Sequence, residues 1–130
     1  MLMLKVLPIL AYGAAVGFIA VVATRERFGG ARAWVLPSVL GVLFLIFSLI
    51  TVANGGLWPF WYNHSTNFAG NQVWFDLLIA VSIGFYLIAP RARAMGMPLL
   101  PWAIAVLATA CVALLPMLAR LLWLEHKAAQ

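Results

Sequence analysis

A carboxylate inside an apolar segment is the first candidate for chemistry in this chain. Asp76 lies about one turn inside a stretch from Val73 to Pro90 that holds no other charged residue. An ionisable side chain at such a depth in lipid is costly and by default suggests a functional role. A structural role is equally open, because a carboxylate in the first turns of a helix favours the positive end of the helix dipole and can accept from unsatisfied N–H groups.

The residues around Asp76 extend the candidate site along one helix. Gln72, Asp76, Ala80 and Gly84 recur at intervals of four residues, a spacing that predicts one narrow stripe on a helix. We expect this stripe to face the interior of a helix bundle or a wet crevice, where the carboxylate of Asp76 would be less costly.

A loop rich in aromatic and amide side chains precedes this helix. It reads WPFWYNHSTNFAGNQVWFD and contains His64, Trp61 and Trp74 but no Lys or Arg. Its aromatics suit an interfacial belt, with residues 57–62 as a short helix lying on the bilayer. Alternatively, they line the mouth of an outward-facing pocket for a lipophilic or cationic guest above Asp76, through cation–π contacts and hydrogen bonds.

The same residues offer little for catalysis or metal binding. A metal site needs three or four ligands, and the only other plausible metal ligands besides His64 are Asp76 and His126. No second carboxylate or activated nucleophile accompanies them, so we predict neither an enzyme nor a metal or other cofactor. An enzyme acting on a lipid would depend on His64 and Asp76 alone.

The elements that position these residues are membrane helices. The 130 residues are 66% hydrophobic and 8% charged, far from the composition of a soluble domain. Four stretches are long enough to cross a bilayer as helices. We therefore predict an all-α polytopic membrane protein, one domain over residues 1–130 formed by a four-transmembrane-helix bundle, with spans at about residues 6–23, 34–53, 73–90 and 99–124. The first stretch is too long for a typical signal peptide and lacks a small-residue cleavage site, so it is kept as a span.

The basic residues set the predicted orientation. Four spans place both Arg-bearing loops on one side and the two termini with the central loop on the other. Five Lys or Arg residues then lie on the first side and three on the second, which favours the Arg loops as cytoplasmic. The termini are accordingly predicted outside. Tryptophans fall at span ends in this arrangement, with Trp123 at the outer interface.

Small residues predict where helices approach closely. Gly13 and Gly17 form a GxxxG pattern in the first span. Later spans offer the packing candidates Ala80, Gly84, Ala105 and Thr109. These faces serve packing within the bundle or contacts with a partner, either another membrane protein or a second copy of the chain.

The net charge of +5 does not indicate a nucleic-acid partner, because the basic residues cluster beside span ends, where membrane topology places them. Their expected partner is the lipid bilayer. The candidates for contact with anionic lipid headgroups are Arg25, Arg27, Arg32, Arg91 and Arg93. They can equally serve only as topology determinants. The single cysteine, Cys111, cannot form an internal disulfide.

Residues 58–127 carry a family resemblance. The amide-rich stretch before FDLL with Asp76, the arginines of PRARAMGMP, the pair Pro101–Trp102 and the closing LLPMLARLLWLEHK resemble a bacterial family of small multi-span membrane proteins of unknown function. The resemblance leaves out the first span and its Arg loop. It implies a multi-span protein of the bacterial cytoplasmic membrane and draws attention to Asp76, without implying an activity.

Two functional hypotheses follow. The first is a non-catalytic membrane protein, either an accessory subunit of a larger complex or a self-associating bundle. The second is a protein that binds or transports a small lipophilic or cationic ligand, which enters from the outer face near Asp76.

Overall fold

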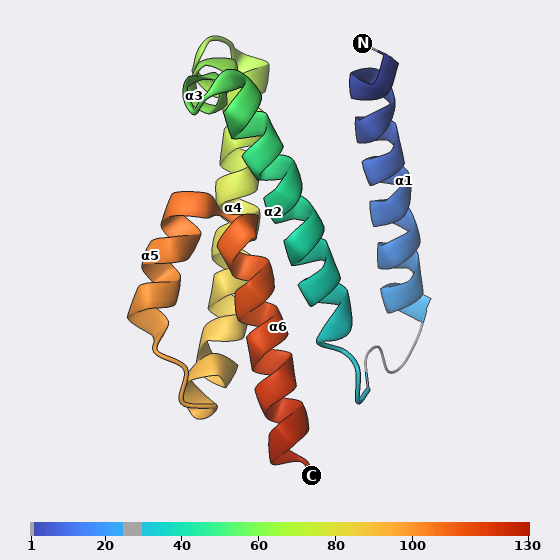
Figure 1. The fold of residues 1–130 in the computed structure, drawn as a ribbon, viewed down its shortest axis with the longest axis vertical. Helices are drawn as coiled ribbons and strands as arrows, with labels where there is room; N and C mark the ends of the chain where they lie inside the picture. Colours follow the sequence, from blue (N-terminus) through green and yellow to red (C-terminus); the bar gives the residue numbers. More distant parts are fainter. Residues whose placement is uncertain (1, 25–29) are drawn as a thin grey trace. The chain divides into compact units, whose positions relative to one another are not determined.

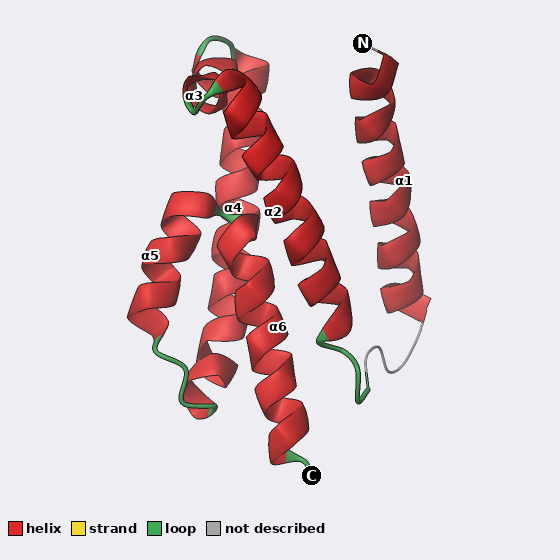
Figure 2. Cartoon of the chain, viewed as in Figure 1, coloured by secondary structure: helices red, strands yellow, loops and turns green. Residues whose placement is uncertain are grey.

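The computed structural model describes residues 2–24 and 30–130, and these residues fold into helices joined by short turns (Figures 1 and 2). In chain order the helices are α1 (Leu2–Thr24), α2 (Val35–Gly55), α3 (Trp58–Ser65), α4 (Phe68–Ala94), α5 (Leu99–Thr109) and α6 (Cys111–Ala128). No strand occurs in the described ranges. The all-α prediction is therefore confirmed.

Among the described residues, three helices are long and apolar enough to cross a membrane, rather than the four predicted. They are α1, α2 and α4, which contain the first three predicted spans. The chain divides into two units, residues 1–31 and residues 32–130, so α1 is described by itself. Its candidate span of 21 residues, Leu4–Thr24, corresponds to about 30 Å of helix, the thickness of the hydrocarbon core.

The predicted fourth span is wrong as a single crossing, because the chain breaks at Ala110. This residue has φ 51° and ψ −122°, which a helix cannot contain, and it separates α5 from α6. The 11 residues of α5 extend only about 16 Å, half of a hydrocarbon core. The 18 residues of α6 include Arg120, Glu125 and Lys127 in their second half.

The two short helices form a hairpin that returns to the end of α4 from which it started (Figure 1). A Cβ placed on Gly84 would lie 3.0 Å from Cδ2 of Leu114, and the guanidinium of Arg91 contacts the carboxylate of Glu125. Position 84 of α4 thus lies beside position 114 of α6, and position 91 lies beside position 125. Because both numbers increase together, α4 and α6 run in the same direction. The chain's C-terminal residues consequently lie at the Arg91 end of α4.

A tight turn after α4 starts this hairpin. Gly96, with φ 72°, follows the last turn of α4, and its N–H donates to the carbonyl of Arg93 at 3.0 Å. The N–H of Met97 donates to the carbonyl of Ala92 at 2.9 Å, which completes a Schellman motif. The side chains of Met97 and Ala92 are both buried, so the apolar contact typical of this motif fixes the exit of the chain towards α5.

The core of the second unit lies around α6. This helix packs against α2, α4 and α5. Met117 and Leu121 are fully buried and cluster with Ile88, Ala92 and Met97 near the Arg91 end. A second cluster joins Val81 of α4, Val106 of α5 and Ala113 of α6 beside the hairpin turn. On α2, Pro37 and Gly41 are buried, and a Cβ on Gly41 would lie 3.4 Å from Cβ of Leu115.

Candidate functional site

The segment predicted as an aromatic loop is mostly helical, since it comprises the helix α3, a short turn and the first turns of α4. Asn67 caps α4, because its side-chain oxygen accepts from the N–H of Gly70 at 2.7 Å. The amide of Asn71 donates to the carbonyl of His64 at 3.0 Å and to that of Asn67 at 3.1 Å. These amides tie the end of α3 to the first turn of α4, and the short helix expected near residues 57–62 is present as Trp58–Ser65.

Gly70 allows α3 to approach α4 this closely. A Cβ at this position would come within 3.1 Å of Cα of His64 and closer still to the carbonyl oxygen of Asn63. Both neighbours belong to the backbone, so a side-chain rotation cannot relieve the clash. Gly70 was not among the predicted site residues, although a glycine in an amide-rich segment between two helices can indicate close backbone approach.

His64 lies in the corner between α3 and α4 and packs on Trp74. The two rings stack with their centroids 5.5 Å apart and their planes 29° apart. The Nδ1 atom of His64 is buried and has no hydrogen-bond partner in the described structure. Two of the predicted site residues are thus brought together, whereas Trp61 is 57% exposed and joins neither ring.

Asp76 and Gln72 lie on another face of α4. Five residues separate Asp76 from the buried Val81, which puts the two about 140° apart around the helix, and Gln72 lies about 180° from Val81. Asp76 therefore does not face α5 or α6, and its expected placement towards a helix bundle or a wet crevice stays a prediction. The expected stripe fails because positions four residues apart drift by about 40° per step, or about 120° from Gln72 to Gly84.

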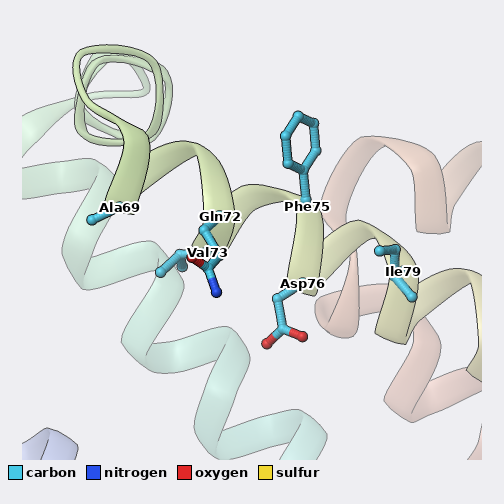
Figure 3. Close-up of a pocket in the computed structure, with 6 residues that line it drawn as sticks. All are labelled: Ala69, Gln72, Val73, Phe75, Asp76 and Ile79. Atoms are coloured by element: carbon cyan, nitrogen blue, oxygen red, sulfur yellow. The ribbon is translucent and has the colours of Figure 1, made fainter.

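The side chains of Gln72 and Asp76 are both exposed. They point to the same side of α4, away from Phe75 (Figure 3). Neither makes a hydrogen bond or ion pair with any described residue. They border a shallow hollow of about 580 Å³ whose lining all comes from α4, namely Ala69, Gln72, Val73, Phe75, Asp76 and Ile79.

The predicted site residues therefore form two separate groups. His64 stacks with Trp74, while Asp76 shares its face with Gln72. Trp74 lies about 160° from Asp76 around α4, so the His64 ring and the carboxylate do not face a common space. Within the described ranges, no group of three or more His, Cys, Asp or Glu residues could hold a metal ion.

The predicted packing residues differ in what they contact. Gly84 lies against Leu114, and Ala105 packs against the cluster around Val81. Ala80 and Thr109 are exposed, and the Thr109 hydroxyl donates to the carbonyl of Ala105 within its own helix at 2.8 Å. Gly13 and Gly17 belong to α1, and their packing partner stays a prediction. The sequence analysis missed Gly41, the close-approach residue between α2 and α6.

The basic end of the molecule is organised around one ion pair. Arg91 donates to both carboxylate oxygens of Glu125, from Nε at 2.8 Å and from Nη2 at 2.5 Å. The ammonium of Lys127 lies 4.3 Å from the ring centroid of Trp123. The side chains of Arg32, Arg91 and Arg93 are all exposed, but Arg91 is already paired with a carboxylate of the same chain. Arg25 and Arg27 lie outside the described residues.

The pairing of Arg91 with Glu125 does not fit a single fourth crossing. Four crossings would put Arg91 and the C-terminal charges on opposite sides of the membrane. The ion pair instead places Glu125 at the Arg91 end, together with Lys127 and Trp123. Trp123 is consequently not at the interface beside α3, where four crossings would have placed it.

Comparison with known proteins found no match. No family model, no curated protein and no solved structure matches the chain.

Proposed function

We propose that this chain is a non-catalytic integral membrane protein that works by association, as an accessory subunit of a membrane complex or as a self-associating bundle. The observation that carries the proposal is the exposed pair of Gln72 and Asp76 on a helix that is long and apolar enough to cross a membrane. Lipid tails offer neither hydrogen bonds nor a counter-charge to a carboxylate. A partner that covers this part of α4 removes that cost.

The positions of the basic residues support a topology for this protein. We propose that α1, α2 and α4 cross the membrane and that the hairpin of α5 and α6 enters and leaves on the cytoplasmic side. Of the eight Lys and Arg residues, only Lys5 then lies outside, and seven lie on the cytoplasmic side. This bias is stronger than the five against three expected for four crossings. The N-terminus is outside and the C-terminus is cytoplasmic in this proposal.

The resemblance to a bacterial family supports the bacterial cytoplasmic membrane as the location. The exposed side chains of Arg32 and Arg93 are then the described residues best placed to bind anionic headgroups, since Arg91 pairs with Glu125.

A second candidate function is binding of a small lipophilic cation at Asp76. The hollow of about 580 Å³ beside Asp76 favours it, because apolar side chains surround a carboxylate and an amide. This hollow is shallow and lined by one helix, so a ligand there would remain largely uncovered. We therefore rank it below association.

Native mass spectrometry of the protein extracted in mild detergent from its source membrane tests the proposal. We expect the chain in a defined assembly, either with two or more copies or with a second protein in fixed stoichiometry. A single copy that retains a small molecule, lost on Asp76→Asn, would replace association with ligand binding. A single copy without partner or ligand would contradict both functions.

A further inference from the structure

One face of α4 has the form of a helix-pairing seam. Going along the helix in alternating steps of four and three residues gives Ala69, Val73, Asp76, Ala80, Ile83 and Leu87, all of which are exposed. Such spacing keeps one line of side chains towards a neighbouring helix that crosses at a small angle. A different face of α4, about 120° around the helix from the seam, is already occupied, since Val81, Ile88 and Ala92 are buried against α5 and α6.

Polar chemistry makes this seam complementary to itself. A carboxylate only accepts hydrogen bonds, whereas the amide of Gln72 carries two N–H donors. Neither group has a partner in the described structure. In a two-fold symmetric interface, any contact from Gln72 of one copy to Asp76 of the other occurs twice. One such interface therefore supplies donors to both carboxylates.

Membrane insertion restricts the geometry of this contact. Two copies with the same topology lie parallel, with the two-fold axis along the membrane normal, so equal positions face each other at equal depth. Gln72 and Asp76 are one helical turn apart, about 6 Å, which the flexible Gln72 side chain spans along the neighbouring helix. The small side chain of Ala80, one turn further into the membrane, lets the two backbones approach closely.

We propose that a second copy of this chain binds along the seam of α4, with each Gln72 amide donating to the Asp76 carboxylate of the other copy. This inference rests on the proposed associative function and names its surface and its partner. Asp76 then acts as the polar position that sets the register of the two helices, as single polar residues do in coiled coils.

Cysteine cross-linking in native membranes tests the surface. In a Cys111→Ala background, we expect oxidation to give covalent dimers for Val73→Cys and Ala80→Cys. Leu78→Cys is the matched control, because Leu78 is 44% exposed and lies on the opposite side of the same helix from the seam. Dimers through Leu78→Cys only, or an intramolecular cross-link between Ala80→Cys and a cysteine introduced at Val16 of α1, would overturn the proposal.

Dimer dissociation constants in lipid nanodiscs test the chemistry. Gln72→Glu replaces the donors with a like charge, and we expect it to weaken dimers at neutral pH by about tenfold or more. Asp76→Asn keeps an acceptor for Gln72 but removes the charge, so we expect it to weaken dimers less than Gln72→Glu does. Because both side chains are exposed, far-UV circular dichroism should stay unchanged in both variants.

Equal affinity of Gln72→Glu and the natural chain would overturn the inferred pairing. Dimers that cross-link only through other helices, or a complex holding one copy and a different protein, would also overturn the inference while leaving the associative function intact. A chain that stays monomeric and without partner in its source membrane would instead end the associative function itself.

Discussion

Replacing Gly70 by alanine is expected to destabilise the protein by about 2–3 kcal/mol. The new Cβ would overlap the carbonyl of Asn63 and approach Cα of His64 to 3.1 Å. Because both obstacles are backbone atoms, α3 must move away from α4. That movement would break the hydrogen bond from Asn71 to the carbonyl of His64 and the stacking of His64 on Trp74.

The measurement is the fraction of SDS in mixed micelles at which helicity is lost. Gly41→Ala is the matched control, since Gly41 is also a helical glycine next to another helix but its Cβ would make an ordinary contact at 3.4 Å with Leu115. We expect a change of less than about 1 kcal/mol there, because alanine also favours the helix. An equal loss in both variants would show that the α3–α4 corner is not specially constrained.

Leu121→Ala is expected to cost about 2 kcal/mol, at the lower end of the range for buried leucines. Leu121 is fully buried in the cluster that joins α6 to α4, and its truncation leaves a cavity. The hydrophobic part of the cost is small in a membrane, because lipid and protein interior are both apolar, so the lost packing contacts carry the effect.

Leu107→Ala is the control for this substitution, because Leu107 on α5 is 86% exposed. We expect its free energy of unfolding in mixed micelles to stay within about 0.5 kcal/mol of that of the natural protein. If Leu107→Ala proved as damaging as Leu121→Ala, α6 would not be the helix around which this unit packs.

Composition and apolar run length were sufficient to predict the helices that are long and apolar enough to cross a membrane. The segments that became α1, α2 and α4 are uninterrupted and bounded by Arg, Gly or Pro residues, so both their type and their approximate ends follow from the sequence. The short helix α3 was also anticipated, because Pro59 near its start and the amides after it are typical helix boundaries.

The break at Ala110 could not be predicted in the same way. Glycine and proline usually indicate a chain reversal, yet the residues around this break are Thr109, Ala110 and Cys111 in an apolar run. Pro116, the next proline along the chain, lies inside α6 rather than at the break. Long-range packing of α6 between α2 and α4 accompanies the reversal, and such contacts leave no local pattern.

The break at Ala110 also explains why the sequence identified Asp76 as a candidate residue but did not predict the direction of its side chain. Its isolated charge identified it as a candidate residue without any structure. Its direction depended on which helices surround α4, and the expected four-helix bundle supplied the wrong neighbours. In the structure α6 begins near the level of Val81, so no turn of α6 extends alongside Asp76.

The hairpin of α5 and α6 is the central structural claim, because the proposed topology depends on it. Its most direct test is cysteine labelling with a membrane-impermeant maleimide in a Cys111→Ala background, with single cysteines at Ala129, Ala94 and Ser65, all exposed positions. In intact cells we expect Ser65→Cys to label while Ala94→Cys and Ala129→Cys stay unlabelled, and in lysed cells we expect all three to label. If Ala129→Cys labelled together with Ser65→Cys in intact cells, the last segment would cross the membrane after all and the hairpin would be contradicted.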